Sequence, residues 1–320
     1  IASQRIVTGP RKGIHIVEGP HHFVCSGKEF NNVAGEHTVD SMQVHNIEGG
    51  ELRKLVAGNT VVVKCSSDTP WAGRWLADCI RDAGLPPGAY AEERLIPAHR
   101  LMLLPDAISD QQAAGMMLQG MTVQYLLRST FHVKPGDTIL FHAAAGGVGL
   151  IACQWAKALG ATVIGTVGNP EKAELARKHG CDFPLLYQEE DWVSKVKEIT
   201  DGEGVPVVYD SVGGETFMKS LDCLRPLGLL ASFGQASGPV APFDPALLAA
   251  KGSLFLTRPT LMTYTADRTD LLASATDLFA VVESGEVSIE VNQTYPLSEA
   301  AQAHRDLEAR KTTGSTVLLA

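Results

Sequence analysis

The feature that most constrains the fold of this chain is a bend built from small residues. The segment FHAAAGGVG, at positions 141–149, contains nothing larger than valine from Ala143 onward. The turn KPGD and the apolar run TILFH lead into it, as is typical of a turn followed by a buried strand. The stretch LIACQWAKALG follows and is typical of a helix that ends at Gly160, after which ATVIGTV is typical of a second strand. This order of strand, bend, helix and strand predicts a βαβ unit.

The small residues of the bend have the spacing Ala144-x-Gly146-x-x-Gly149, a dinucleotide-binding fingerprint with alanine at the first small position. Such a bend needs small residues because the turn is tight, the main chain approaches a pyrophosphate, and the helix packs closely on the sheet. The start of the helix also offers free N–H groups and the positive end of its dipole to phosphates. The alternative is a purely structural glycine turn. The strand–turn–helix context favours the diphosphate site.

The rest of the chain continues the alternation of strands and helices. Four further runs are typical of strands, at positions 181–187, 205–212, 228–234 and 253–258. The segments between them are typical of helices, at positions 189–200, 214–226 and 244–252. The pattern predicts an α/β fold, a Rossmann doubly wound parallel sheet of about six strands.

The end of the second strand indicates which dinucleotide binds. An NAD site usually has an acidic residue there, which binds the ribose 2′-hydroxyl. Here the strand ends with Thr166, Val167 and Gly168, and none is acidic. Asn169 is a typical N-cap, and Lys172 then falls in the first helical turn, beside the expected position of a 2′-phosphate. The sequence favours NADPH over NADH, with an ordinary solvated lysine as the alternative for Lys172.

A family resemblance covers positions 88–320. It is carried by the stretches FHAAAGGVGLIACQWAKALGATVIGTV, VVYDSVG, SFGQASGPV, LTRPTL and RKTTGSTVLL. Together they resemble the NADPH:quinone oxidoreductases, the zeta-crystallin-like branch of the medium-chain dehydrogenases/reductases. The resemblance implies that the Rossmann domain is inserted into a GroES-like, partly β-barrel catalytic domain, with NADPH in the cleft between them. The implied domains are 1–119 (catalytic, first part), 120–259 (Rossmann) and 260–320 (catalytic, second part).

The resemblance also implies which residues hold the phosphates of the cofactor. The pyrophosphate would lie on Gly146, Gly147, Val148 and Gly149. The adenosine 2′-phosphate would lie in a pocket formed by Gly168, Asn169, Lys172, Tyr187 and Arg310. Lysine and arginine suit a dianionic phosphate because they form charge-assisted hydrogen bonds with it. The alternatives are an aromatic ring packing at a strand end for Tyr187 and a solvated charge for Arg310.

The remaining implied contacts involve the ribose and nicotinamide groups. Ser211 would lie near the adenosine ribose, and Thr122 and Tyr125 near the nicotinamide ribose and the phosphates. The nicotinamide half would be lined by Phe233, Gly234, Gln235 and Arg258. The family more often has asparagine at the position of Gln235, and a solvated charge is the alternative for Arg258.

Positions 1–87 depart from the family pattern. The expected Asn-Phe-x-Asp, Arg-x-Gly-x-Tyr and Gly-x-Glu-x-x-Gly motifs are missing there. A longer stretch precedes Gly88 and predicts an added helix from Thr69 to Gly84. Cys25, His37 and Cys65 are the candidate ligands for a zinc site, but scattered Cys and His residues usually bind no metal. We therefore expect no metal site.

Composition narrows the class of protein. The net charge of −9 argues against a phosphate-backbone binder, so no nucleic-acid partner is expected. No apolar run approaches the ~18 residues of a membrane helix, and the first residues lack the plan of a signal peptide. The six widely spaced cysteines favour reduced thiols in a cytoplasmic protein. The apolar edge candidate SLFLTR, together with the resemblance, predicts a homodimer.

The function expected from these observations is reduction of quinones, or of related electron-poor enones and carbonyls, by NADPH without zinc. The protein would supply position and exclude water during hydride transfer. No Ser-Tyr-Lys or Ser-His-Asp set is visible, so no catalytic acid or base is assigned. Two alternatives remain: an NADPH-binding structural or regulatory protein without turnover, and a zinc-dependent alcohol dehydrogenase.

Overall fold

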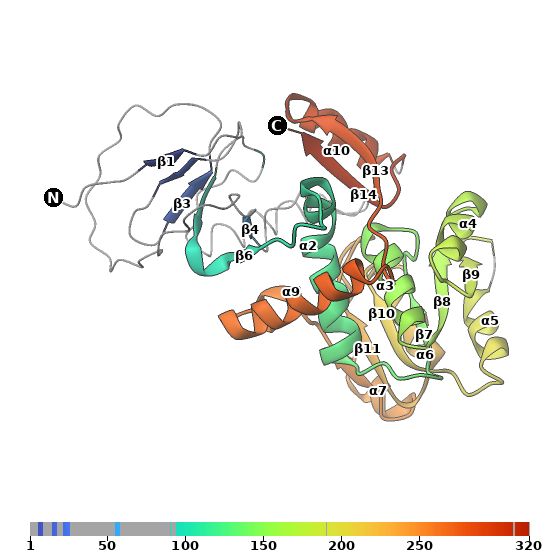
Figure 1. The fold of residues 1–320 in the computed structure, drawn as a ribbon. Coiled ribbons are helices and arrows are strands. Elements are labelled where there is room, and N and C mark those ends of the chain that lie inside the picture. The colour runs from blue at the N-terminus through green and yellow to red at the C-terminus, as the bar shows by residue number, and fades with distance from the viewer. Residues whose placement is uncertain are drawn as a thin grey trace.

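The computed structural model describes Tyr90 and residues 94–319 except 190 and 310, together with four short strands nearer the N-terminus. Its centre is a six-stranded sheet in the order β12-β11-β10-β7-β8-β9, in which all neighbours pair in parallel (Figure 1). The strands are β7 (Thr138–Phe141), β8 (Thr162–Val167), β9 (Phe183–Leu186), β10 (Val205–Asp210), β11 (Leu224–Ser232) and β12 (Phe255–Thr257).

The order of the strands fixes where a ligand can bind. The chain runs outward from β7 through β8 to β9, then returns to the other side of β7 and runs outward through β10, β11 and β12. Ligands of such sheets bind beyond the carboxyl ends of the strands at the point where the order reverses, here between β7 and β10. The predicted doubly wound Rossmann sheet is confirmed.

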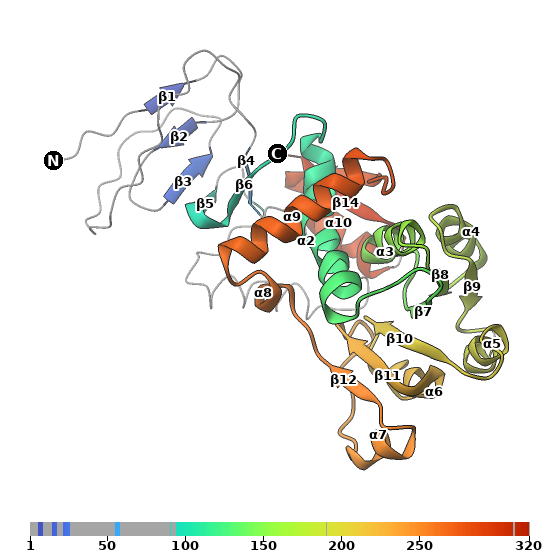
Figure 2. The same cartoon turned by 60° about the horizontal axis from the view of Figure 1, so that its bottom comes forward.

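Helices cover both faces of this sheet (Figure 2). Those inside the Rossmann unit are α3 (Gly147–Ala158), α4 (Pro170–Lys178), α5 (Trp192–Ile199), α6 (Phe217–Cys223) and α7 (Ala246–Ala250). Before and after it come α2 (Asp110–Tyr125), α8 (Leu261–Tyr264), α9 (Arg268–Glu283) and α10 (Ala300–Glu308). No helix among the described residues has both the length and the apolar character needed to cross a membrane.

Two separate cores result from the alternation of side chains along the strands. On β7, Ile139 and Phe141 belong to the core that includes residues of α2, α3 and α9, whereas Leu140 belongs to the core that includes residues of α5 and α6. All three are at most 1% exposed. A parallel strand that is buried on both faces reads as a continuous apolar run, which is why TILF could be recognised in the sequence.

The remaining strands form small two-stranded sheets outside the Rossmann unit. β13 (Val291–Pro296) pairs in parallel with β14 (Ser315–Leu319). The antiparallel pairs are β1 (Ile6–Thr8) with β2 (His15–Val17), β3 (His22–Cys25) with β5 (Arg94–Pro97), and β4 (Leu55–Ala57) with β6 (Leu101–Leu103). The helix predicted from Thr69 to Gly84 lies outside the described residues.

Candidate functional site

The bend between β7 and α3 contains three glycines, and an added side chain would meet different surroundings at each of them. At Gly149 an added Cβ would lie 2.3 Å from the carbonyl oxygen of Ala143, so the helix could not approach the bend. At Gly147 it would lie 2.4 Å from Oε1 of Gln119. At Gly146 it would meet only the oxygen of Ala143, at 3.1 Å. Gly146 is therefore the motif glycine with the most open space around its missing side chain.

The start of α3 suits a diphosphate. Gly146 is the N-cap and has no side chain to cap the helix, and the first internal bond runs from Leu150 N to Gly146 O at 2.8 Å. The N–H groups of the first helical turn, which come before Leu150, thus have no partner within the helix, and the positive end of the helix dipole lies among them. Because glycine also leaves the approach open, the residues at this position fit the phosphates of a dinucleotide.

Gln119 of α2, which sequence reasoning did not single out, supports this bend from beneath. Its side chain is 5% exposed and lies 2.9 Å from Oγ of Ser315 on β14. Gly314, next to Ser315, forms an isolated parallel bridge with Gly146. The C-terminal strand pair is therefore joined directly to the bend, and the space beside Gly147 is occupied by the amide of Gln119.

Four of the residues expected around the 2′-phosphate, Gly168, Asn169, Lys172 and Tyr187, lie at or beside the tip of β8. The ring of Tyr187 lies beside Gly168, where an added Cβ would be 3.5 Å from Cε1. The side chain of Asn169 accepts a hydrogen bond from the backbone N–H of Lys172 at 2.9 Å, which confirms the predicted N-cap of α4. Lys172 is half-buried in the first turn of that helix.

The structure addresses one of the alternatives for these residues, that of Tyr187. Tyr187 packs against the core on the α5–α6 face of the sheet, so the ring serves the packing of the strand end as well. Arg310 lies outside the described residues.

The tips of β10 and β11 are fastened to each other. The backbone N–H groups of Phe233 and Gly234 donate to the carbonyl oxygen of Asp210, at 2.8 and 3.3 Å. An added Cβ on Gly234 would lie 2.4 Å from the carbonyl oxygen of Ser211, so glycine is required for this close approach. Ser211, Phe233, Gly234 and Gln235 are thus brought together at the carboxyl end of the sheet, and all four are partly exposed.

A stacked pair of tyrosines and an arginine come together near the end of α2. Tyr125, at the end of α2, stacks on Tyr264 with ring centroids 4.5 Å apart. Burial raises the pKa of the Tyr125 phenol well above its ordinary value, although the Arg258 guanidinium opposes this, so the phenol keeps its proton. Arg258 donates from Nη1 to the carbonyl oxygen of Ser232 at 3.0 Å. Arg258 is therefore anchored at the tip of β11. Thr122 instead bonds within its own helix, to Leu118 O at 2.7 Å.

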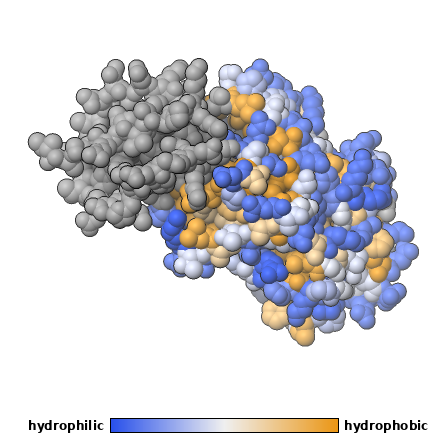
Figure 3. All heavy atoms as spheres, viewed as in Figure 1, coloured by the Kyte–Doolittle hydropathy of each residue, from blue (hydrophilic) through white to orange (hydrophobic). Residues whose placement is uncertain are grey.

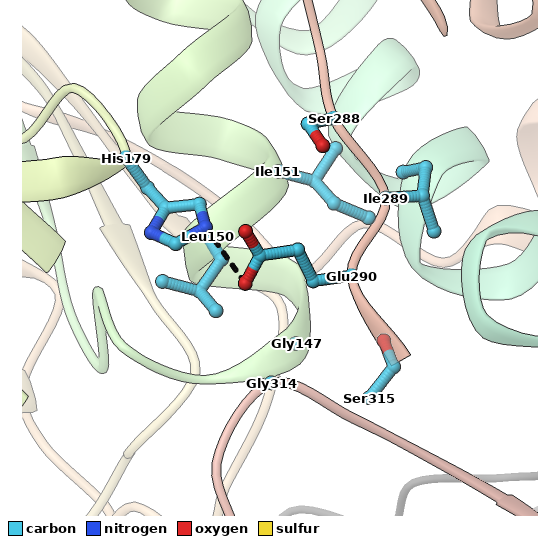
Figure 4. Close-up of a pocket in the computed structure, with 9 residues that line it drawn as sticks. All are labelled: Gly147, Leu150, Ile151, His179, Ser288, Ile289, Glu290, Gly314 and Ser315. Carbon is cyan, nitrogen blue, oxygen red and sulfur yellow. Dashed lines mark ion pairs between the residues drawn. The ribbon is translucent and has the colours of Figure 1, made fainter. Parts of the chain in front are cut away.

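A hollow on another side of α3 does not suit phosphates (Figure 4). Its lining includes Gly147, Ile151, His179, Glu290 and Ser315, with no lysine or arginine among the lining residues. The His179 ring is paired with the carboxylate of Glu290, Nε2 to Oε2 at 3.5 Å. A carboxylate without a neighbouring free cation repels an anion, so the open side of Gly146 is the better phosphate site.

No cluster of three or more metal-ligating side chains occurs among the described residues. The side chains of Cys25, His37 and Cys65, from which a zinc site would have to be drawn, lie outside the part that the structure describes.

The sheet order and the uncapped glycine start of α3 at its switch point define a dinucleotide-binding protein of the dehydrogenase class. Two sequence-family profiles match the chain: that described as "Zinc-binding dehydrogenase" over residues 147–273, and that of the aldehyde dehydrogenase family over residues 51–92. The chain is 54% identical to a quinone oxidoreductase of Pseudomonas aeruginosa over 76% of this chain and 75% of that protein. It is 51% identical to a 2-haloacrylate reductase of a Burkholderia species, over 73% of this chain and 72% of that protein.

Similarity in structure agrees with similarity in sequence. The crystal structure of the Escherichia coli quinone oxidoreductase complexed with NADPH matches with a TM-score of 0.72 and 50% identity, over 74% of this chain and 73% of that one. This chain belongs to the NADPH:quinone oxidoreductase family of the medium-chain dehydrogenases/reductases.

Proposed function

We propose that this protein transfers hydride from NADPH to quinones and to related electron-poor enones and carbonyls. The observation that carries the proposal is the uncapped glycine start of α3 at the switch point of the sheet. The tip of β8 has no acid, and Lys172 follows Glu171 in the first turn of α4. Membership of a family with an NADPH-bound relative and a 2-haloacrylate reductase supports both the cofactor and the class of acceptor.

In the proposed cofactor site the phosphates lie on two helix starts. Gly146–Gly149 at the head of α3 hold the pyrophosphate through backbone N–H groups. Lys172 and Tyr187 bind the 2′-phosphate, with Gly168 and Asn169 lining the pocket and Arg310 as the further cation. A lysine and an arginine on one dianion make charge-assisted hydrogen bonds that NADH would not form.

The nicotinamide half lies over the tips of β10, β11 and the end of α2 in this proposal. Ser211 faces the adenosine ribose, and Thr122 and Tyr125 face the nicotinamide ribose and phosphates. The nicotinamide itself would be lined by Phe233, Gly234, Gln235 and Arg258. The bonds from Phe233 and Gly234 to Asp210 keep this edge rigid, which supports precise positioning.

When bound, NADPH supplies the hydride, and the residues of the chain position it and exclude water. The stacked pair Tyr125 and Tyr264 is well suited to exclude water, because the Tyr125 side chain is 3% exposed. Ser232 holds the Arg258 guanidinium at the tip of β11. In this proposal the guanidinium stabilises the negative charge that develops on a reduced quinone. We propose that solvent delivers the proton.

The domain boundaries 1–119, 120–259 and 260–320 are part of the proposal, with the flanking segments forming the second domain. The join between β14 and the head of α3, through Ser315 and Gln119, supports close contact of the last segment with the cofactor domain. The aldehyde dehydrogenase match at 51–92 is a feature that a GroES-like plan does not explain.

We propose a cytoplasmic homodimer that pairs through the outer edge of β12, which has no partner strand among the residues that the structure describes. Phe255 is 60% exposed on this edge strand, and Leu227 on the neighbouring strand is 67% exposed. On the face drawn in Figure 3, hydrophobic residues of the described part lie in separate areas among hydrophilic ones. An apolar edge strand that lacks a partner is a ready site for pairing with a second copy.

Steady-state kinetics with NADPH and NADH, against several quinones and a 2-haloacrylate, test the proposed function. We expect turnover with NADPH well above that with NADH, and no loss on treatment with a chelator. Cofactor binding without turnover of any acceptor would indicate a structural or regulatory protein. Bound zinc together with loss of activity on chelation would indicate an alcohol dehydrogenase.

A further inference from the structure

A fully buried histidine lies directly beneath the candidate cofactor site. His142 follows β7 and is 0% exposed, yet both ring nitrogens have partners: Nδ1 is 2.8 Å from Oγ1 of Thr166, and Nε2 is 2.9 Å from Oγ of Ser220. The edge of the imidazole packs against Trp192, with centroids 5.1 Å apart and ring planes at 83°. Packing and two hydrogen bonds therefore hold the ring in one orientation.

The connection continues to a buried carboxylate. Oγ of Ser220 lies 3.1 Å from Oδ2 of Asp210, and both residues are 0% exposed. Asp210 also accepts from the backbone N–H groups of Val212 and Gly213, at 2.8 and 3.0 Å, and from Oγ1 of Thr216. We call Thr166–His142–Ser220–Asp210 the strand-tip chain, because it links the ends of β8, β7 and β10 through α6.

The donors and acceptors of the strand-tip chain assign its direction. Burial lowers the pKa of His142, against the opposing effect of Asp210, so the ring is neutral and has one donor and one acceptor. The hydroxyl of Ser220 lies between two groups that only accept, the carboxylate of Asp210 at 3.1 Å and the carbonyl oxygen of Thr216 at 2.9 Å, so its one hydrogen points to this pair and its oxygen receives from His142 Nε2–H. Thr166 then donates to Nδ1. The bonds point head to tail from Thr166 through His142 to Ser220 and its two acceptors, an arrangement in which each bond strengthens the next.

Both ends of the strand-tip chain touch the two halves of the proposed cofactor site. The carbonyl oxygen of Thr166 accepts from Ala144 N of the bend at 3.0 Å, and Thr166 lies two positions before Gly168 of the 2′-phosphate pocket. At the other end, the carbonyl oxygen of Asp210 accepts from the backbone N–H groups of Phe233 and Gly234, at 2.8 and 3.3 Å, and these two residues belong to the proposed nicotinamide half. An apolar cluster would fill this space without any polar group to satisfy, so a polar chain indicates a requirement for fixed geometry.

We propose that His142 is a positioning residue that sets the spacing between the 2′-phosphate half and the nicotinamide half of the NADPH site. The fixed position of the His142 ring acts on the two halves separately. Thr166 connects the ring to the adenosine phosphate end, and Ser220, through Asp210, connects it to the nicotinamide end. The inference rests on the proposed placement of the cofactor.

The test removes one hydroxyl at a time with little change of shape. Thr166→Val is expected to weaken binding of 2′,5′-ADP roughly fivefold in calorimetry, because it deletes one buried hydrogen bond at that end. Thr166→Ser, which keeps the hydroxyl, is expected to restore binding to within about twofold. Ser220→Ala is expected to leave 2′,5′-ADP binding within about twofold and to lower kcat with a quinone roughly fivefold.

A merely structural role predicts a different result. Thr166→Val and Ser220→Ala would then change both readouts together, in proportion to their loss of thermal stability, and this outcome would overturn the proposal. Unchanged 2′,5′-ADP binding and unchanged kcat in both variants would overturn the proposal too. The placement of the cofactor is checked separately with wild-type protein and Lys172→Ala. If wild-type protein fails to bind 2′,5′-ADP, or Lys172→Ala binds it equally well, the placement has failed rather than the strand-tip chain.

Discussion

Two alanine substitutions in the same bend are expected to impair two different properties, the stability of the fold and the binding of NADPH. Gly149→Ala places Cβ 2.3 Å from the oxygen of Ala143 and 2.6 Å from the carbonyl group of Ala144. Both distances are far inside ordinary contact, which begins at 3.4 Å, and the neighbours are backbone atoms that cannot turn away. Gly146→Ala meets a single atom at 3.1 Å, and its φ of −79° is open to any residue. Gly149→Ala should therefore lower the stability of the fold, and Gly146→Ala should weaken the binding of NADPH.

The size of each effect follows from these contacts. Overpacking at Gly149 is expected to cost about 1–3 kcal/mol of the free energy of unfolding, which lowers Tm by roughly 3–10 °C. Gly146→Ala is expected to leave Tm within about 2 °C and to raise the Kd for NADPH roughly tenfold, the equivalent of one charge-assisted hydrogen bond. Thermal unfolding by circular dichroism and NADPH calorimetry measure both. If Gly146→Ala lowers Tm as far as Gly149→Ala while its Kd stays unchanged, the reasoning is refuted.

Further predictions concern the 2′-phosphate, the dimer and the buried histidine. Lys172→Ala should raise KM for NADPH roughly tenfold or more and leave KM for NADH unchanged. The matched control Lys178→Ala, in the last turn of the same helix, should alter neither KM. Equal effects of Lys172→Ala on both coenzymes would contradict this prediction. Phe255→Asp should shift the protein from dimer to monomer in light scattering with kcat retained, and an unchanged mass would show that β12 is not the interface. Because burial lowers the pKa of folded His142 below 6.5, the unfolded chain takes up a proton that the folded chain excludes, so the free energy of unfolding should fall as pH drops below 6.5, by up to about 1.4 kcal/mol per unit. His142→Gln should flatten that part of the curve in denaturant titrations, and equal slopes would refute it.

The Rossmann part of the fold could be predicted because each of its signals is local. Strands buried on both faces read as apolar runs, and the glycine bend, the cap at Asn169 and the stop at Gly160 mark the helix ends. The absence of an acid at the tip of the second strand could be read in the same way. These residues act on neighbours within a few positions, so one sequence was sufficient.

Contacts between distant residues could not be predicted. Gln119 lies 28 positions before the glycine that it forces to be small, and nothing in its own helix distinguishes it from a surface glutamine. His142 ended an apolar run, but its partner Ser220 is 78 positions away. Such pairs are set by the order of the strands in the sheet, which places β7 between β8 and β10. The substrate pocket depends further on positions 1–87, where the sequence lacks the family's motifs.

A crystal structure of the NADPH complex would test the placement of the cofactor most directly. The pyrophosphate oxygens are expected to accept hydrogen bonds from backbone N–H groups in the first turn of α3, on the open side of Gly146, with the 2′-phosphate beside Lys172. A cofactor whose phosphates lie elsewhere, for example in the hollow beside Glu290, would contradict it.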